Sequence, residues 1–486
     1  MTGCQSLLAC GATPATLRAI SFLQVRPVTS TAFNTLPLSA AMLANLESLG
    51  YTEMTPVQAQ SLPVMLKGLD LIAQAKTGSG KTAAFGIGLL NPLNPRYFGC
   101  QALVICPTRE LADQVAKEIR RLARSAENIK VLTLCGGAPF GPQIASLEHG
   151  AQIIVGTPGR IQQHLRKETL KLDGLNTLVL DEADRMLDMG FHDSIADIIS
   201  QTPSKRQTLL FSATYPASIK QLSAAFMRDP QQVRAESMHG NSQIEQRFYE
   251  IDPSERMDAV VKLLACFRPQ SCVAFCFTKI QCQELVEHLG ANGISAMALN
   301  GDLEQRDRDQ VLAMFANRSL SVLVATDVAA RGLDIDALDM VINVELARDS
   351  EIHIHRVGRT GRAGEKGMAM SLVAPPEAHR ATAIETLQKG PLNWHPLNSL
   401  KPQAGPPIRP PMVTLCIGGG RKDKVRPGDI LGALTGDAGI PGAQVGKIAL
   451  FDYQAYVAVE RDVAQQALQR LNDGKIKGRS LRVRLL

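Results

Sequence analysis

Short apolar runs alternate with longer amphipathic segments along most of this 486-residue chain. Runs rich in Val, Ile and Leu predict strands buried on both faces, as in a parallel sheet covered by helices. In the first half they lie at 102–106, 131–135, 152–156, 177–181 and 208–212, and in the second half at 272–277, 294–299, 321–326, 340–344 and 368–373. The segments between them, such as 109–126, carry apolar residues at helical spacing. The pattern predicts two α/β domains joined near residues 230–245.

The pattern changes after residue 390. Residues 391–411 contain seven prolines in 21 positions, which predicts a semi-stiff linker without a fold of its own. We expect Trp394 there to cap the core of the second domain rather than to stack on a base. The rest reads as strand, helix, strand, strand, helix, strand, which suits one small antiparallel sheet with two helices. The predicted units are therefore 31–236, 245–390, the linker 391–411, and 412–486.

Composition places the chain among globular proteins, with 45% hydrophobic and 20% charged residues. No apolar stretch approaches the ~20 residues that cross a membrane, so we expect no membrane partner. The ten cysteines form no CxxC pair and no His/Cys cluster at metal spacing, which predicts buried thiols and a reducing, cytoplasmic setting. Residues 1–30 lack acidic residues and the features of a secretory signal, so we read them as a disordered extension; a misassigned start codon would also explain them.

The net charge of +6 is unevenly distributed. Residues 411–486 hold 12 Lys/Arg against 7 Asp/Glu, whereas residues 1–410 hold 40 against 39. A small basic unit therefore follows a nearly neutral body. This distribution favours a polyanion as the partner of the tail, although a solvated basic face would look the same.

A candidate phosphate loop lies early in the first domain. Ligands of parallel α/β sheets bind beyond the carboxyl ends of the strands, and this loop follows a strand directly. Its glycines let backbone amides close on phosphate, its lysine reaches the β/γ oxygens, and its threonine supplies a hydroxyl for Mg²⁺. The loop comprises Ala75, Lys76, Thr77, Gly78, Ser79, Gly80, Lys81 and Thr82. Ala75 stands where the general pattern has its first glycine, and a plain Gly/Ser-rich turn is the alternative.

Three acidic residues, Asp181, Glu182 and Asp184, stand at the end of the strand-like run 177–181. Asp181 and Glu182 form the start of the tetrapeptide "DEAD", about a hundred residues after the phosphate loop. A phosphate loop needs one group to hold Mg²⁺ and another to handle water. We expect Asp181 to bind the metal, largely through water, and Glu182 to polarise the attacking water. The sequence therefore predicts a site for ATP and Mg²⁺.

These motifs resemble those of the DEAD-box RNA helicases. The resemblance covers roughly residues 33–375, where the motifs appear in the family's order: "GYTEMTPVQ", "AKTGSGKT", "PTREL", "GG", "TPGR", "DEAD", "SAT", "FTK", "GDLEQRDR", "ATDVAARGLD" and "HRVGRTGRAG". It implies two tandem RecA-like domains and an RNA-dependent ATPase that separates short duplexes. The tail segments "RPGDILGALTGDAGI" and "DGKIKGRSLRVRLL" resemble the RNA-binding tail of a bacterial branch of the family that is directed to 23S ribosomal RNA.

The resemblance also implies roles for residues of the nucleotide site. Gln58 would read the adenine edge, because an amide donates and accepts at once, and Phe33 would stack on the ring unless it only packs the helix beside it. Asp334 would accept the ribose hydroxyls. Arg359 and Arg362 would act as arginine fingers on the γ-phosphate, with His355 in the same network or in a structural role. Ser212 and Thr214 would couple the nucleotide site to strand separation.

Candidate RNA contacts of the core carry hydroxyl, guanidinium or bare-backbone donors, which suit a sugar-phosphate backbone and read no base edges. The 2′-hydroxyl would let such a site prefer RNA. On the first domain the candidates are Thr108, Arg109, Gly136, Gly137, Thr157, Gly159 and Arg160; on the second they are Thr278, Arg308, Thr326 and Gly332.

Specificity would then come from the tail, whose order of elements matches an RRM. The aromatic-rich strand expected of an RRM is missing, since only Tyr453 and Tyr456 stand in the corresponding run. We therefore expect basic loops to bind a folded hairpin, through Arg421, Lys422, Lys424, Arg426, Lys475, Lys477 and Arg479.

The motifs imply an ATP-dependent helicase that acts on 23S rRNA in pre-50S particles, with no obligate protein partner evident. Two alternatives remain open. The chain could be an ATP-gated RNA clamp or general RNA chaperone with little unwinding, because the same motifs serve both. A DNA translocase is disfavoured by the sequences of the motifs "DEAD" and "PTREL".

Overall fold

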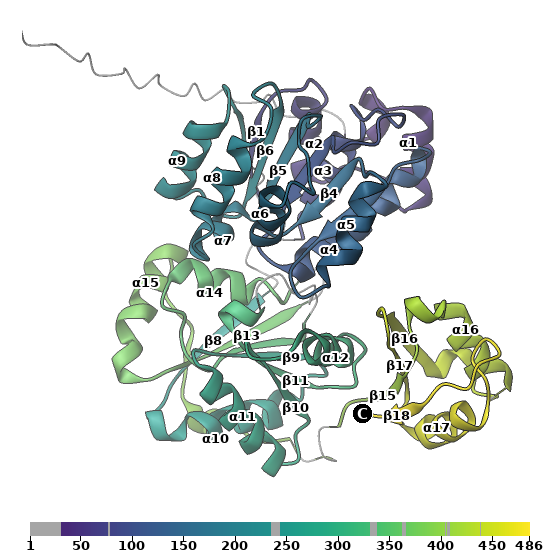
Figure 1. Cartoon of the computed structure of the whole chain (residues 1–486). Coiled ribbons are helices and arrows are strands. Elements are labelled where there is room, and N and C mark those ends of the chain that lie inside the picture. The colour runs from purple at the N-terminus through teal and green to yellow at the C-terminus, as the bar shows by residue number, and fades with distance from the viewer. Residues whose placement is uncertain are drawn as a thin grey trace, which may run out of the picture.

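The computed structural model (Figure 1) describes residues 31–75, 78–234, 244–330, 338–361, 366–403, 405, 409–437 and 439–486. These residues form two α/β lobes and a smaller C-terminal unit, the tail (residues 412–486). The first lobe is the one that contains β1, and the second lobe is the one that contains β8. The extension predicted at 1–30 lies outside the described residues.

The first lobe contains one parallel sheet, whose described strands run in the order β3-β4-β2-β5-β6-β1-β7. The strands are β1 (Leu71–Gln74), β2 (Ala102–Ile105), β3 (Val131–Leu134), β4 (Ile153–Gly156), β5 (Thr177–Asp181), β6 (Gln207–Ser212) and β7 (Gln231–Arg234). The helices are α1 (Ala40–Ser48), α2 (Pro56–Met65), α3 (Lys81–Leu90), α4 (Arg109–Leu122), α5 (Phe140–Glu148), α6 (Pro158–Arg166), α7 (Ala183–Asp188), α8 (His192–Ser200) and α9 (Ala217–Phe226).

Alternation along these strands builds two cores, one on each face of the sheet. In β2, Val104 faces one core, whereas Leu103 and Ile105 face the other. Successive side chains of a strand point to opposite faces, so a wholly apolar run fills both sides at once. The five apolar runs predicted in this half all lie on strands of this sheet.

The second lobe repeats the plan, with the described strands in the order β10-β11-β9-β12-β13-β8-β14. The strands are β8 (Ile244–Glu250), β9 (Cys272–Cys276), β10 (Ala296–Leu299), β11 (Val322–Thr326), β12 (Met340–Asn343), β13 (Gly367–Val373) and β14 (Trp394–His395). The helices are α10 (Arg256–Phe267), α11 (Lys279–Ala291), α12 (Gln305–Ala316), α13 (Asp327–Ala330), α14 (Ser350–Val357) and α15 (Ala378–Gln388). All pairings are parallel, so two doubly covered sheets confirm the predicted fold class.

The Pro-rich stretch differs from the prediction in its first part. Residues 394–395 form β14 on β8, and Leu392 and Leu397 are buried against the second lobe. Trp394 contacts Phe248, with ring centroids 5.8 Å apart, yet it stays 48% exposed and so covers the core only in part. Regular backbone pairing at one edge of the sheet holds this segment despite its prolines, which lie outside the paired residues.

The tail has the predicted order of elements around one antiparallel sheet, β16-β17-β15-β18. Its elements are β15 (Met412–Ile417), α16 (Pro427–Gly432), β16 (Val445–Leu450), β17 (Ala455–Glu460), α17 (Ala464–Asp473) and β18 (Val483–Leu485). One face of the sheet, which includes Leu415 and Val457, packs with the two helices into the tail's own core. The opposite face carries Thr414, Cys416 and Tyr456.

That opposite face lies on α12 of the second lobe. Cys416 and Tyr456 form a buried cluster with Ala313 of α12. At the end of that helix, Asn317 Nδ2 donates to Thr414 Oγ1 at 2.8 Å, and Thr414 Oγ1 donates back to Asn317 Oδ1 at 3.2 Å. The tail is therefore docked through the face that an RRM commonly presents to RNA.

The Thr414 hydroxyl offers a test of this docking. Thr414 is fully buried, and the change Thr414→Val would leave both polar ends of Asn317 without that partner. We expect the free energy of unfolding to fall by about 1–3 kcal/mol, the cost of burying unsatisfied polar groups. Urea titration would measure the change, with Thr382→Val on the exposed face of α15 as the control. Equal stability of the two variants would show that the reciprocal bonds do not hold the tail.

No helix among the described residues is long and apolar enough to cross a membrane. Of the described cysteines, all but Cys266 are buried, and burial raises the pKa of the Cys100 thiol to about 12. These cysteines pack as small apolar side chains, as predicted.

Candidate functional site

The predicted phosphate loop lies between β1 and α3, at the carboxyl edge of the first sheet. Gly78 and Gly80 have φ angles of 81° and 91°, a left-handed conformation that glycine adopts without strain. A Cβ atom on Gly80 would lie 2.7 Å from Gln58 Nε2 and 2.9 Å from Thr55 Oγ1. The backbone therefore needs glycine at this position both for conformation and for space. Lys76 and Thr77 lie outside the described residues.

Lys81 reaches from this loop to the acidic cluster. Its Nζ lies 2.9 Å from Asp181 Oδ1 and 3.6 Å from Glu182 Oε1, and all three side chains are buried. Burial alone would lower the pKa of Lys81, but the two carboxylates outweigh it and the pKa is raised. Asp181 ends β5, so the sequence run "TLVLD" delivers its carboxylate to the sheet edge where the loop lies.

Glu182 follows with a left-handed backbone, at φ 53° and ψ 51°. A residue other than glycine in this region costs on the order of 1–3 kcal/mol. Its carboxylate accepts a hydrogen bond from Arg185 Nη1 at 2.8 Å, from the first turns of α7. The left-handed turn at Glu182 ends the strand and keeps the carboxylate in the site, where Arg185 holds it.

The charges of this cluster fit a divalent cation. Asp181, Glu182 and Asp184 are buried, with Lys81 beside Asp181 and Glu182 and with Arg185 paired to Glu182. Burial raises the pKa of Asp181 even with the Lys81 ammonium beside it, because two carboxylates share that one charge in a dry site. No cluster of three or more His, Cys, Asp or Glu side chains suited to a metal occurs in the described part of the chain. The assignment of Mg²⁺ to Asp181 and the Thr82 hydroxyl, largely through water, stays a prediction.

Asp184 connects this cluster to the predicted "SAT" segment. Its Oδ2 accepts from the backbone amides of Ala213 and Thr214 at 3.1 and 2.9 Å, and from Thr214 Oγ1 at 3.0 Å. The Thr214 side chain also lies close to Glu351 of the second lobe, where it partly offsets the effect of burial, which raises the pKa of the Glu351 carboxyl. Thr214 thus links the acidic motif to the other lobe. The buried Ser212 hydroxyl accepts or donates no hydrogen bond, so a coupling role for Ser212 stays a prediction.

Gln58 lies beside the loop, whereas Phe33 packs in the core of the first lobe. Gln58 accepts from the Thr55 amide at 2.9 Å and donates to Gly80 O at 3.1 Å, which ties α2 to the phosphate loop. Phe33 is 5% exposed and packs edge-on against Tyr51, with ring centroids 6.4 Å apart. This contact fits ordinary packing, so stacking of Phe33 on adenine also stays a prediction.

The second lobe closes the opposite side of the site. A cavity between the lobes is lined by Arg185 and Asp188 of the first lobe and by His355, Arg356 and Arg359 of the second. Arg359 is 7% exposed. Burial and the nearby Arg185 lower the pKa of His355 to about 4, so its ring is neutral at pH 7. The predicted finger and histidine therefore face the DEAD cluster across the cavity, whereas Arg362 and Asp334 lie outside the described residues.

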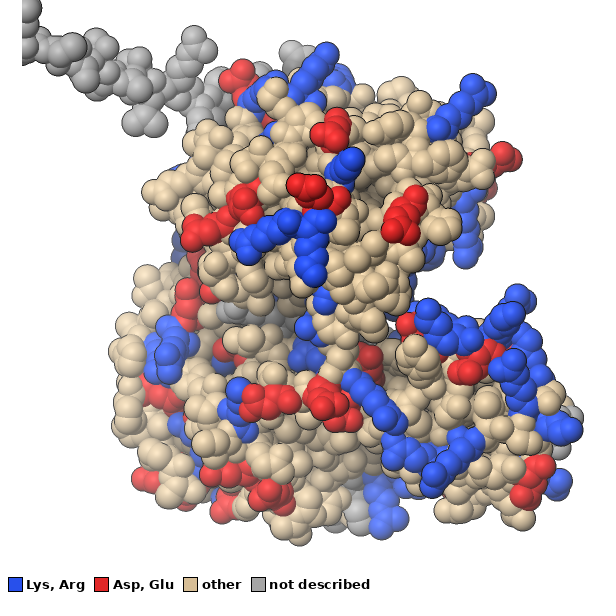
Figure 2. Space-filling view, viewed as in Figure 1, with Lys and Arg blue, Asp and Glu red and all other residues tan. Residues whose placement is uncertain are grey.

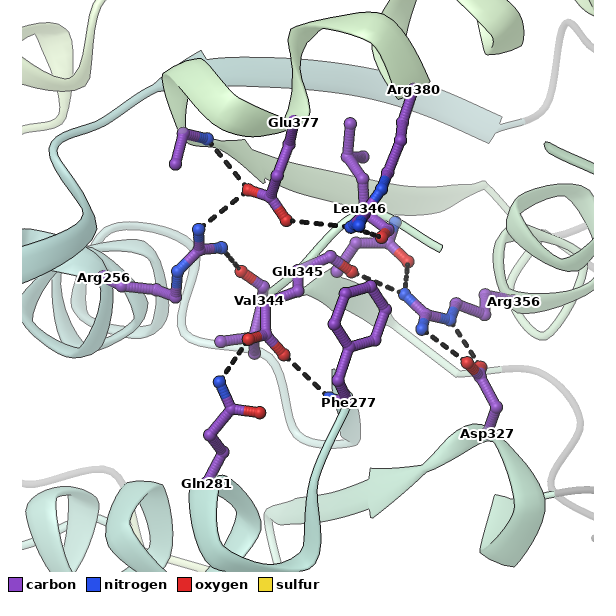
Figure 3. A network of polar contacts seen from close by, with 12 residues as sticks. Arg256, Phe277, Gln281, Asp327, Val344, Glu345, Leu346, Arg356, Glu377 and Arg380 are labelled. Carbon is purple, nitrogen blue, oxygen red and sulfur yellow. Dashed lines mark hydrogen bonds and ion pairs between the residues drawn. The ribbon is translucent and has the colours of Figure 1, made fainter. Parts of the chain in front are cut away.

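Arg356 is a residue that the sequence analysis missed. Figure 3 shows its guanidinium directed at Asp327, with Nε and Nη2 2.6 and 2.7 Å from the two carboxylate oxygens. Nη1 donates to Asn343 Oδ1 and to Glu345 O at 3.1 and 2.7 Å. This buried network joins the segments "ATDVA" and "HRVGR", so Arg356 orients the helix that carries His355. Its position between the predicted site residues His355 and Arg359 was the only feature of the sequence that pointed to it.

The RNA candidates of the first lobe gather around one arginine. The Arg109 side chain lies against Gly136 and Gly137, where a Cβ on Gly137 would fall 1.8 Å from its Nη1. Arg160 is close enough to Arg109 that burial and this like charge lower its pKa. Thr108 and Thr157 precede α4 and α6 as N-caps, and Gly159 leaves open space in the first turn of α6. Exposed glycine backbone beside two guanidinium groups suits a phosphate chain.

The candidates of the second lobe have local structural partners. Thr278 caps α11, and Thr326 accepts from the Ala329 amide at 3.4 Å. Arg308 forms an ion pair with Glu110 of the first lobe and donates to Ala329 O at 2.6 Å. The structure thus brings Arg308 to the first lobe, but Gly332 lies outside the described residues.

In the tail, the predicted basic residues lie in two loops that meet. Lys477 Nζ donates to Lys424 O at 2.6 Å, and Arg479 Nη1 to Asp423 O at 3.4 Å. All seven predicted basic side chains are exposed, and Figure 2 shows Lys and Arg gathered over this unit. Tyr456, in contrast, is 1% exposed beneath α12 and unable to stack on a base, whereas Tyr453 is 69% exposed.

Comparison with protein families finds three matches along the chain. Residues 55–222 match the DEAD/DEAH box helicase family, and residues 255–364 match the helicase conserved C-terminal domain. Residues 414–485 match the DbpA RNA binding domain. The order of the matches follows the order of the two lobes and the tail.

Similar proteins agree with these matches. The ATP-dependent RNA helicase DbpA of Escherichia coli is 56% identical over 459 residues, which cover 94% of this chain and all of that protein. The DEAD-box ATP-dependent RNA helicase CshA of Bacillus subtilis is 44% identical over 74% of this chain and 72% of its own. Among solved structures, Saccharomyces cerevisiae Dbp5 bound to RNA and ADP BeF3 superposes with a TM-score of 0.69 at 28% identity, covering 76% of this chain and 97% of that one.

Proposed function

The chain belongs to the DEAD-box ATP-dependent RNA helicases, and from this premise we propose that its tail directs an RNA-dependent ATPase to 23S ribosomal RNA during assembly of the large ribosomal subunit. Short RNA duplexes within the pre-50S particle would be its substrates. ATP would be hydrolysed between the lobes, with Mg²⁺ held by Asp181 and Thr82 and serving to neutralise the phosphates.

The roles of the ATP-site residues follow from their placement. Lys81 and the amides of the phosphate loop would bind the phosphates, and Gln58 and Phe33 the adenine. Glu182 would hold the attacking water and take up its proton, because its carboxylate is buried and fixed by Arg185. Arg359 would stabilise the charge that develops on the γ-phosphate, with Arg362 as a second finger and Asp334 on the ribose.

Coupling would come from closure of the two lobes. ATP groups are supplied by both lobes, and so are the RNA candidates, so each ligand would favour the closed arrangement that the other needs. Contacts across the interface support this view: Arg109 donates to Gln305 Oε1 at 2.7 Å, and Arg308 pairs with Glu110. The core RNA contacts would grip a backbone without reading its sequence.

One observation carries the assignment of specificity to the tail. Its sheet face is occupied by α12, while its two basic loops lie together and exposed. A folded RNA element, whose phosphates present a shaped anionic surface, suits such loops better than a single strand stacked on the sheet. The match to the DbpA RNA binding domain supports the same proposal.

Deletion of residues 411–486 tests the proposal. We expect the shortened chain to keep an RNA-stimulated ATPase but to lose its preference for 23S fragments, so that stimulation becomes similar for all single-stranded RNAs. ATPase rates against a panel of ribosomal fragments would measure this, with the full chain as the reference. A preference retained without the tail would contradict the assignment. Multiple-turnover unwinding of a duplex joined to a 23S fragment would separate a helicase from an ATP-gated clamp.

A further inference from the structure

Helix α12 lies where the first lobe, the second lobe and the tail meet. Its first turns contact α4 of the first lobe through Gln305 and Arg308. Its later residues contact the tail, where Arg484 donates to Gln310 Oε1 at 3.3 Å and Ala313 packs under Tyr456. Asp309 stands between these two sets of contacts and is only partly exposed.

Three side chains form a chain of hydrogen bonds across this junction. Arg109 Nη1 donates to Gln305 Oε1 at 2.7 Å, and Gln305 Nε2 donates to Asp309 Oδ1 at 2.9 Å. A carboxylate only accepts hydrogen bonds, so it fixes which end of the amide faces it. With the NH₂ group held by Asp309, the Gln305 oxygen must point at the Arg109 guanidinium.

The position of Arg109 matters because its guanidinium lies against the Gly136–Gly137 backbone. A planar guanidinium with one nitrogen held by Gln305 presents its remaining donors in one direction. We propose that Asp309 is a positioning residue which, through Gln305, sets Arg109 for RNA when the two lobes close. The inference rests on the proposed RNA-stimulated activity and adds to it a group that touches neither nucleotide nor RNA.

The charges around Asp309 make closure depend on pH. Glu110 and Asp113 of α4 face it from the first lobe, Arg308 accompanies it on α12, and Tyr456 lies on the tail side. Burial first, and then these carboxylates, raise the pKa of Asp309 to about 6. Separation of the lobes removes Glu110 and Asp113, so the pKa falls toward its ordinary value. A proton is then taken up on closing, and closure becomes more favourable as the pH falls through about 6.

Two substitutions separate the hydrogen bond from the charge. Asp309→Ala removes the acceptor and lets the Gln305 amide turn. We expect the RNA concentration at which half of the molecules are closed to rise about fivefold. This change corresponds to the loss of one ordinary hydrogen bond. Asp309→Asn keeps an acceptor and removes the titration, so it should close at least as readily as wild type at pH 7.5. For this variant, the RNA concentration at which half of the molecules are closed should also change less between pH 7.5 and pH 5.5 than it does for wild type.

Closure is measured by energy transfer between dyes on the two lobes of the full chain, with a uridine oligomer and a non-hydrolysable ATP analogue. Asp307→Asn, which removes an exposed charge from the same helix, should match wild type at both pH values. In an Arg109→Ala background, the Ala substitution at 309 should have no further effect. The inference would be overturned if Asp309→Ala closed like wild type. It would also be overturned if Asp309→Ala weakened closure as much in the Arg109→Ala background as it does in the wild-type chain. ATP turnover of the wild-type chain on RNA reports separately on the proposed function.

Discussion

Replacing Glu182 with Gln should leave a protein that binds ATP and RNA but scarcely hydrolyses ATP. The amide has nearly the same shape and still accepts the hydrogen bond from Arg185 that holds Glu182 at 2.8 Å. It has no basic oxygen to take the proton of the attacking water. Loss of such general-base assistance lowers turnover about 10²-fold or more.

Steady-state ATPase rates at saturating RNA, together with RNA affinity measured with ATP present, would test this expectation. Glu148→Gln is a matched control, because it makes the same change at an exposed position of α5 in the first lobe. Turnover of Glu182→Gln within a factor of about three of wild type would remove Glu182 from the role of base. A collapse of ATP affinity would point instead to a role in binding.

Replacing Arg359 with Ala should also slow hydrolysis, by at least about 10²-fold, because arginine fingers supply this much or more of the rate in phosphoryl transfer. Arg359 comes from the second lobe and lines the cavity that faces the DEAD cluster. The phosphate loop belongs to the first lobe, so nucleotide affinity of the chain without RNA should stay within about threefold of wild type.

Single-turnover rates with saturating RNA, set beside equilibrium binding of a fluorescent ATP analogue, separate these two effects. Arg359→Lys is an informative companion, since lysine keeps the charge but loses the forked donors that match phosphate oxygens. We expect its rate to fall between those of wild type and the Ala variant. An Ala variant that hydrolyses ATP at the wild-type rate would exclude Arg359 from the site.

Most of the fold could be predicted because its signal is local. An apolar run such as 177–181 is buried on both faces and so identifies itself as a central strand. Strands at or near the ends of the sheets carry less of that signal. β7 (Gln231–Arg234) is an edge strand and β8 (Ile244–Glu250) lies next to the edge strand β14; both contain charged and polar residues, and no apolar run marked them. Their pairing depends on partners far away in the sequence.

The site was predictable where a short motif fixes chemistry, as for Lys81 and Asp181, which the structure places 2.9 Å apart. It was not predictable where a residue acts through a distant partner. Nothing in "HRVGR" distinguishes the buried, salt-bridged Arg356 from Arg359, the predicted arginine finger. Thr414 and Tyr456 alternate along their strands as solvent-facing residues would, so their burial under α12 needed the second lobe to be seen.

The docked face of the tail has a consequence for work with fragments. Cys416 lies on that face, 2% exposed in the intact chain. A fragment consisting of the tail alone would expose this thiol together with Tyr456. Such a fragment would be open to air oxidation and to covalent dimers through Cys416, which is covered in the intact chain. In the intact chain, the rate at which an alkylating reagent modifies Cys416 would then report how often the tail detaches from α12.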